Sequence, residues 1–146
     1  QESLPQNRTL ISLAALGKPY FPIMGSSPID AAKNITVPSL ILSGDKDCIT
    51  PAEVHQKPLY NLLDSTKTMI TIKGGDHCGF TDSITCPIAE AIRCGFFQGS
   101  TIKEKEQREL SSQLILLWLD HFLKEKPNSW SSFKSFSTSL TQTKHH

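Results

Sequence analysis

The sequence lacks the long hydrophobic run that a membrane-spanning helix requires. Its apolar stretches are short, and Leu114–Leu119 falls far below the roughly 20 residues that cross a bilayer. Charge of one sign is also lacking, because 15 basic and 14 acidic side chains leave a formal net charge of +1. No broad electrostatic field therefore favours nucleic acid or anionic lipid, and we expect neither a nucleic-acid partner nor a membrane span.

The amino-terminal end lacks the features of a targeting signal. Residues 1–5 contain no initiator Met, no basic segment and no apolar core of a signal peptide. We interpret this end as processed or truncated, so localisation has to be argued from other features.

The four cysteines lack the C-x-x-C spacing of a zinc ribbon or a thioredoxin-like site. They lie at Cys48, Cys78, Cys86 and Cys94. An even number is consistent with two disulfides and an oxidising compartment, which is the interpretation we favour. Reduced, buried thiols are the main alternative.

The hydrophobic segments that are present predict an α/β fold. With 38% hydrophobic and 20% charged residues, the 146-residue chain has the composition of one soluble globular domain. Short apolar runs predict strands at Thr9–Leu16, Ser39–Ser43 and Thr68–Ile72. We expect about three parallel strands with flanking helices, in which Thr9–Leu16 is an edge strand that something covers.

Capping residues predict a helix directly after the second strand. Thr50 has the side chain of an N-cap, Pro51 fits the first helical position, and Glu53 completes a capping box. The helix is expected to be interrupted at Pro58 and to resume afterwards. A shorter helix is predicted to begin at Pro28.

A long helix is predicted over Glu104–Glu125 and is ended by Pro127. Its apolar residues recur at helical spacing and form one face for packing on the sheet, at Leu110, Leu114, Leu117, Trp118 and Phe122. We place a domain boundary at residue 128. Residues 129–146 form a polar tail that should dock near Trp130 and be partly disordered towards its end.

Acidic and histidine side chains follow two of the predicted strands. Asp45 and Asp47 come after Ser39–Ser43, and Asp76 and His77 come after Thr68–Ile72. Reacting groups of open α/β sheets gather at these carboxyl ends, where a carboxylate can orient an imidazole that acts as a general base. The alternative is that the acids are turn formers and the histidine is an ordinary loop residue.

These two loops resemble those of α/β-hydrolases. The segment 34–51 has the form V-P-x-L-x-x-x-G-x-x-D-x-x-x-P of the acid loop, and 73–80 (KGGDHCGF) is similar to the histidine loop. The likeness is strongest to dienelactone-hydrolase-like and polyester-hydrolase-like secreted esterases and runs from about Leu10 to Leu123. It implies Asp47 as the triad acid, His77 as the base and Asp45 as a turn residue.

The chain departs from that family pattern in its nucleophile. The family carries a serine on a G-x-S-x-G elbow before the acid and the histidine, and no such motif occurs here. Residues 25–28 (GSSP) lack the second glycine. We therefore expect a C-terminal part of the α/β-hydrolase fold, with the N-terminal half and the nucleophilic serine outside this chain.

The resemblance also implies a disulfide pairing and a location. Polyester hydrolases similar to this chain have a bridge between the acid and histidine loops, which here is Cys48–Cys78. Cys86 and Cys94 are then left to close a short loop. A secreted or periplasmic protein is expected.

The predicted function is ester cleavage by a Ser-His-Asp triad to which this chain contributes His77 and Asp47. The expected partners are an unidentified ester substrate and the missing N-terminal half or a second chain. No cofactor is expected. Two alternatives are a non-catalytic α/β interaction module without a nucleophile and a metal site at His77, Cys78, Cys86 and Cys94, which the spacing hardly supports.

Overall fold

The computed structural model describes residues 8–17, 28–83, 85–95 and 99–145. Its described strands form one sheet of order β1-β2-β3-β4. Strands β1 (Leu10–Leu13), β2 (Ser39–Gly44) and β3 (Lys67–Ile72) are parallel, and β4 (Thr141–His145) runs antiparallel to β3. The parallel sheet with flanking helices confirms the predicted α/β fold.

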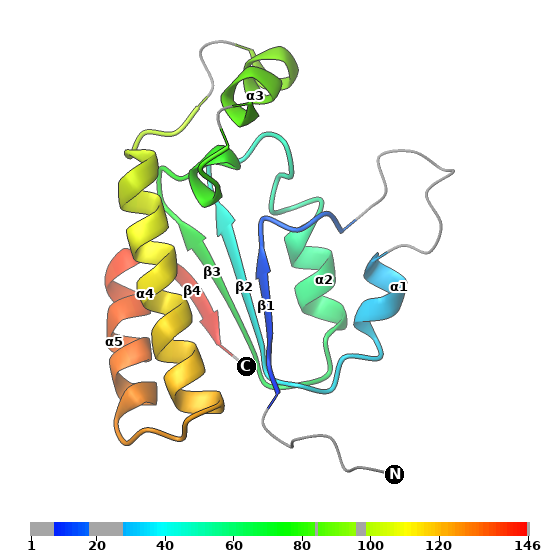
Figure 1. The fold of residues 1–146 in the computed structure, drawn as a ribbon. Coiled ribbons are helices and arrows are strands. Elements are labelled where there is room, and N and C mark those ends of the chain that lie inside the picture. Colours follow the sequence, from blue (N-terminus) through cyan, green and yellow to red (C-terminus); the bar gives the residue numbers. More distant parts are fainter. Residues whose placement is uncertain (1–7, 18–27, 84, 96–98, 146) are drawn as a thin grey trace.

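Helices cover both faces of the sheet (Figure 1). On one face lie α1 (Pro28–Ala32) and α2 (Gln56–Leu62), and on the other lie α4 (Glu104–Phe122) and α5 (Ser129–Leu140). Helix α3 (Cys86–Cys94) lies beyond the carboxyl ends of the parallel strands, next to the 3₁₀ turn η1 (Cys78–Phe80). The loops predicted to carry chemistry end at this same edge of the sheet.

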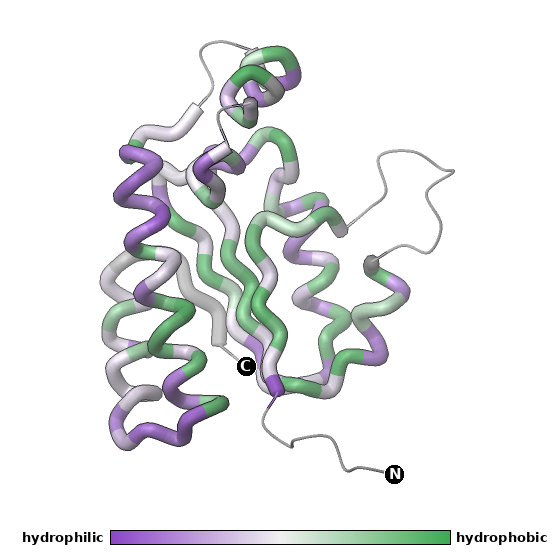
Figure 2. Tube along the Cα trace, viewed as in Figure 1, coloured by the Kyte–Doolittle hydropathy of each residue, from purple (hydrophilic) through white to green (hydrophobic). Residues whose placement is uncertain are grey.

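Strand β2 is buried over its whole length, which explains its uninterrupted apolar centre. Ile41 points into a cluster with α1 and α2, whereas Leu40 and Leu42 point into a cluster with α4 and α5. Figure 2 shows hydrophobic residues concentrated along the parallel strands. The sheet therefore separates two apolar layers, as helices on both faces require.

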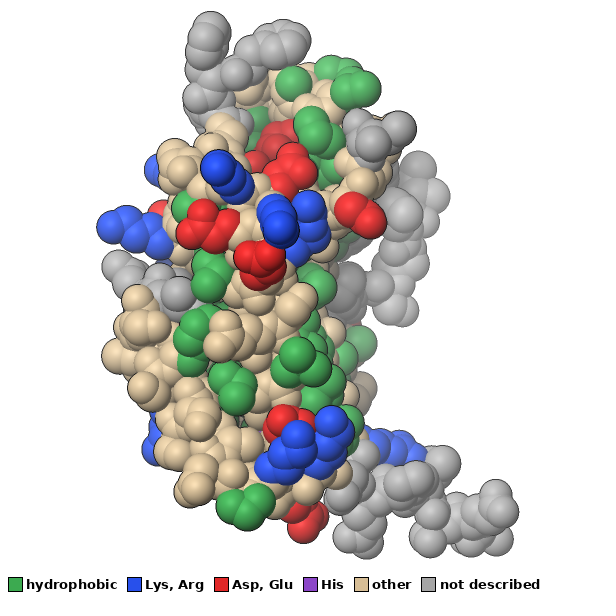
Figure 3. All heavy atoms as spheres, turned by 60° about the vertical axis from the view of Figure 1, so that its left-hand side comes forward, with side chains coloured by type: hydrophobic (Ala, Val, Ile, Leu, Met, Phe, Trp, Pro, Cys, Tyr) green, Lys and Arg blue, Asp and Glu red, His purple; other side chains and the backbone are tan. Residues whose placement is uncertain are grey.

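The long helix α4 packs on the sheet with the predicted face. Leu114 and Trp118 are fully buried, and Trp118 Nε1 donates a hydrogen bond to Thr9 Oγ1 at 2.7 Å. The helix ends at Phe122, three residues before the predicted end. Figure 3 shows its outer side, where acidic and basic side chains gather together at the two ends of the face and leave no patch of one sign.

The capping prediction at Thr50 is wrong. Residues 52–55 form turns, and α2 begins only at Gln56, so that Pro58 occupies its first turn instead of interrupting it. Thr50 Oγ1 instead lies in the interior, 2.9 Å from Ala14 O and 2.8 Å from Asp47 Oδ2, and donates its one proton to either acceptor. The capping motif fails because the hydroxyl has nearby buried partners that local sequence does not reveal.

The polar C-terminal segment contains helix α5 and strand β4 among the described residues, and the partly disordered tail expected from its composition stays a prediction. Phe133 is fully buried and Trp130 stacks on it with ring centroids 5.3 Å apart. The residues at 130, 133, 136 and 137 share one side of a helix, a spacing that the abundance of Ser and Thr concealed. The domain boundary at residue 128 stays a prediction.

Candidate active site

Close backbone contact brings the acid loop and the histidine loop together. Gly44 ends β2, and a Cβ at this position would overlap the backbone carbonyl of Gly75 at the end of β3. Gly74 has a φ of +78°, as expected for a sharp turn after the strand. Glycine is thus needed on both sides of the contact, for proximity at Gly44 and for backbone conformation at Gly74.

Asp47 and His77 meet above this contact, as the sequence predicts. His77 Nδ1 lies 3.0 Å from Asp47 Oδ2. Asp47 is 5% exposed, whereas the His77 side chain is 30% exposed. Since the carboxylate can only accept, Nδ1 carries the proton, and Nε2 keeps the lone pair that a general base requires.

Thr50 is a third member of this cluster, which the sequence analysis missed. Its backbone N–H donates to Asp47 Oδ1 at 2.7 Å, and its hydroxyl lies 2.8 Å from Asp47 Oδ2 and 3.1 Å from His77 Nδ1. Thr50 therefore contacts both oxygens of the Asp47 carboxylate and also the imidazole of His77. Its position three residues after an acid at a strand end was the available signal, but it was interpreted as a helix cap.

The protonation of the pair follows from its surroundings. Burial would raise the pKa of Asp47, but hydrogen bonds from His77 and Thr50 outweigh it and lower that pKa below its ordinary value. The hydrogen bond to Asp47 raises the pKa of His77, partly opposed by burial and assisted by the negative charges of Asp47, Glu90 and Asp76. The carboxylate is thus ionised, and it stabilises the imidazolium that forms when His77 accepts a proton.

The histidine loop is fixed by the long helix α4. Gln107 on α4 is fully buried; its Nε2 donates to Asp76 O at 2.8 Å and its Oε1 accepts from Asp76 N at 3.0 Å. The Asp76 carboxylate accepts from Gly79 N at 2.7 Å and Ser100 N at 2.9 Å. Asp76 therefore organises the loop around His77, a role that the sequence did not indicate.

Asp45 is exposed and acts on the backbone, as expected for a turn residue. Its Oδ1 accepts a hydrogen bond from Gly74 N at 2.6 Å. This hydrogen bond joins the acid loop to the histidine loop at the protein surface. The Asp47–His77 hydrogen bond joins the same two loops through a buried carboxylate.

All four cysteines form disulfides, but not in the predicted pairs. The bridges are Cys48–Cys94 and Cys78–Cys86, with Cα–Cα distances of 5.9 and 5.5 Å. The predicted Cys86–Cys94 pair is wrong because both residues lie on α3, where eight residues span about 12 Å, beyond the reach of a disulfide. The predicted Cys48–Cys78 pair fails with it, since each of these cysteines bonds to one end of α3.

This pairing removes the ligands of the proposed metal site. A metal at His77, Cys78, Cys86 and Cys94 would need free thiolates, and these cysteines are bonded to each other or to Cys48. The same holds for the cluster of Cys48, Glu90 and Cys94, whose ligand atoms lie within 4.8 Å of one another.

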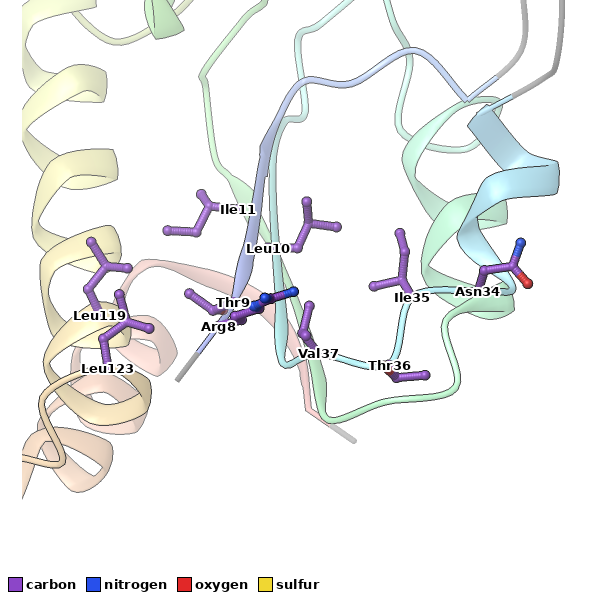
Figure 4. A pocket seen from close by; sticks show the side chains of 10 residues that line it. All are labelled: Arg8, Thr9, Leu10, Ile11, Asn34, Ile35, Thr36, Val37, Leu119 and Leu123. Atoms are coloured by element: carbon purple, nitrogen blue, oxygen red, sulfur yellow. The ribbon is translucent and has the colours of Figure 1, made fainter. Parts of the chain in front are cut away.

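A hollow of about 710 Å³ lies away from the Asp47–His77 pair, beside the edge strand β1. Figure 4 shows it at the opposite, amino-terminal end of the parallel strands. Its lining combines the start of β1, the segment before β2 and the end of α4 (Arg8, Thr9, Leu10, Ile11, Asn34, Ile35, Thr36, Val37, Leu119 and Leu123). The hollow is thus a feature of the sheet edge, not of the candidate active site.

Residues 25–27 of the GSSP segment, where no nucleophile elbow is expected, lie outside the described part of the chain. Within the described part, no helix combines the length and the apolar character needed to cross a bilayer.

Comparisons with known proteins identify the family. A model described as "PETase: PET hydrolase-like" matches residues 13–92, more than half of the chain. Cutinase 1 of Thermobifida cellulosilytica is 41% identical over 46 residues, which are 30% of this chain and 18% of that cutinase. The two disulfides and the cutinase match both suggest an extracellular protein. The matched range contains the acid loop, the histidine loop and most of α3, and the chain belongs to the PET hydrolase-like family of ester hydrolases.

Proposed function

We propose that this chain supplies the acid and the base of a Ser-His-Asp triad that cleaves carboxylic esters. The observation that carries the proposal is the 3.0 Å contact between His77 Nδ1 and the buried Asp47 carboxylate at the carboxyl ends of adjacent parallel strands. The cutinase match covers only 18% of that protein, so the activity of the whole enzyme is part of the proposal.

The proposed chemistry assigns one task to each side chain. A serine hydroxyl outside this chain attacks the ester carbonyl while His77 Nε2 accepts its proton, and the imidazolium then returns the proton to the leaving alkoxide. Asp47 holds the imidazole in the tautomer with the proton on Nδ1 and stabilises the imidazolium. Thr50 fixes the carboxylate through its N–H and hydroxyl.

Hydrolysis of a p-nitrophenyl ester tests the assignment in a protein that includes the segment with the nucleophile. His77→Ala and Asp47→Ala should each lower kcat/KM by several orders of magnitude with unchanged circular dichroism. Asp45→Ala is the matched control, because this carboxylate lies in the same loop and, among the described residues, bonds to the Gly74 backbone and not to His77. Unchanged turnover in the His77 variant would remove the proposal.

The edge strand β1 supports a proposal for the partner. Leu13 is 41% exposed, and β1 pairs on one side only among the described strands. We place the missing N-terminal half of the hydrolase, or a second chain, against this edge and its hollow. In the non-catalytic alternative, this edge of the sheet binds a second copy of the chain. A stable dimer that hydrolyses no ester together with any nucleophile-bearing segment would favour that alternative. A secreted or periplasmic location is proposed on the disulfides.

A further inference from the structure

Helix α3 is bonded to the candidate active site at both of its ends. Its first residue, Cys86, bonds to Cys78, which directly follows His77. Its last residue, Cys94, bonds to Cys48, which directly follows Asp47. The helix therefore spans the acid and histidine loops, and its orientation relative to the Asp47–His77 pair is fixed by covalent bonds.

The exposure of its side chains is opposite to that of an ordinary surface helix. Glu90, in the middle of α3, is 6% exposed, whereas Ile88 and Ile92 are 62% and 81% exposed. Burying a carboxyl group and exposing two isoleucines is unfavourable on hydrophobic grounds alone. The two disulfides hold α3 in this orientation, so the position of Glu90 requires an explanation in the site beneath it.

Glu90 faces three ionisable groups of that site. It interacts electrostatically with Asp76, Asp47 and His77. Its Oε1 lies 3.8 Å from Cys48 Sγ, a van der Waals contact, since the disulfide sulfur has no proton to donate. Three carboxyl groups, from the acid loop, the histidine loop and α3, therefore act electrostatically on the imidazole.

The buried carboxyl group of Glu90 lies among other negative charges of the site. Burial, followed by the negative charges of Asp76 and Asp47, raises the pKa of Glu90 to about 7, while His77 opposes this effect. Glu90 therefore changes its charge in the range where a histidine base also titrates.

We propose that Glu90 is a positioning residue for the Asp47–His77 pair, held against it by α3, and that its charge controls how readily His77 accepts a proton. The inference rests on the proposed function for its catalytic meaning, but the interaction itself can be measured without catalysis. Protonated Glu90 is neutral, and the imidazole of His77 then interacts with the charge of Asp47 without a contribution from Glu90. Ionised Glu90 places a further negative charge near the imidazole and favours the imidazolium.

The test is an NMR titration of His77 in the oxidised chain, with its ring signal assigned by its loss in His77→Gln. In Glu90→Gln the pKa of His77 should fall by about half a unit, the size expected for removing one charge from a partly solvated neighbour. Glu90→Asp retains the charge and should leave the pKa of His77 closer to that of the unmodified chain. Glu125→Gln, an exposed acid beyond the far end of α4, is the control.

A His77 pKa that moves no more in Glu90→Gln than in Glu125→Gln would overturn the proposal. It would also be overturned if Glu90→Asp lowered the pKa of His77 as far as Glu90→Gln does, because the retained charge would then have no effect on the imidazole. In the complete enzyme, the acidic limb of the kcat/KM profile should move to lower pH in Glu90→Gln. Failure of the proposed function is distinguishable, because loss of the hydrolase assignment would leave the NMR shift intact.

Discussion

The amide of Gln107 should account for a large part of the stability of the histidine loop. Gln107→Met keeps the length of the side chain but removes both hydrogen bonds to Asp76, of 2.8 and 3.0 Å. A buried polar group left without a partner costs about 1–3 kcal/mol, and here a backbone N–H and a carbonyl both lose theirs. After allowing for the apolar contacts of the thioether, we expect the free energy of unfolding to fall by about 2–4 kcal/mol.

Urea denaturation followed by tryptophan fluorescence measures this loss, because Trp118 is fully buried and loses its surroundings on unfolding. Gln113→Met is the matched control, since Gln113 lies on the same helix and is exposed; it should change stability by less than about 0.5 kcal/mol. A loss below about 1 kcal/mol in Gln107→Met, at an unchanged urea dependence, would refute the reasoning, because the loop would then satisfy its polar groups without the amide.

Three further predictions concern the loops and their tethers. Gly44→Ala should destabilise the fold by about 1–3 kcal/mol, because the added methyl group meets a backbone carbonyl of the histidine loop. Because the pKa of His77 is raised in the folded state, the stabilisation from the protonated imidazole is full below the ordinary pKa of 6.5. It is lost as the pH rises through the higher folded pKa. Unfolding free energies of the chain and of His77→Gln, compared across pH, will show this loss. Tryptic digestion without reduction should give residues 74–93 with an internal disulfide and residues 47–67 joined to 94–103.

Each of these predictions has a contradicting outcome. Gly99→Ala has open space for its Cβ and should be neutral, so an equal loss in both glycine variants would speak against the loop contact. A stability difference between the chain and His77→Gln that grows from pH 6 to pH 8 would reverse the sign expected for a raised pKa. A single disulfide-linked product containing all of the tryptic segments would restore the pairing first expected from family resemblance.

The sequence was sufficient to predict the strands and helices whose apolar side chains follow a regular local pattern. The apolar runs placed β1, β2 and β3 to within a few residues, because buried parallel strands need continuous apolar side chains. The spacing of Leu114 and Trp118 gave the buried face of α4 for the same reason. The candidate pair was also predictable, since adjacent parallel strands bring the loops that follow them together.

Contacts between distant segments were decided by the tertiary structure. The sequence shows that Cys48 follows Asp47 and Cys78 follows His77, but neighbouring side chains point in different directions, and only the helical conformation of α3 excludes a bond between Cys86 and Cys94. Thr50 matched a capping motif, yet its partners Ala14 and His77 are 36 and 27 residues away along the chain.

The burial of Glu90 depends on the same tertiary contacts. The sequence contains an acid between two isoleucines on a short helix, and hydrophobicity alone would turn the isoleucines inwards. Two disulfides from separate loops fix the helix the other way round. The spacing of residues along the chain therefore determined the strands, the helices and the Asp47–His77 pair. Which further side chains lie around that pair was determined by disulfides and hydrogen bonds between distant segments. Such bonds form only where the fold brings those segments together.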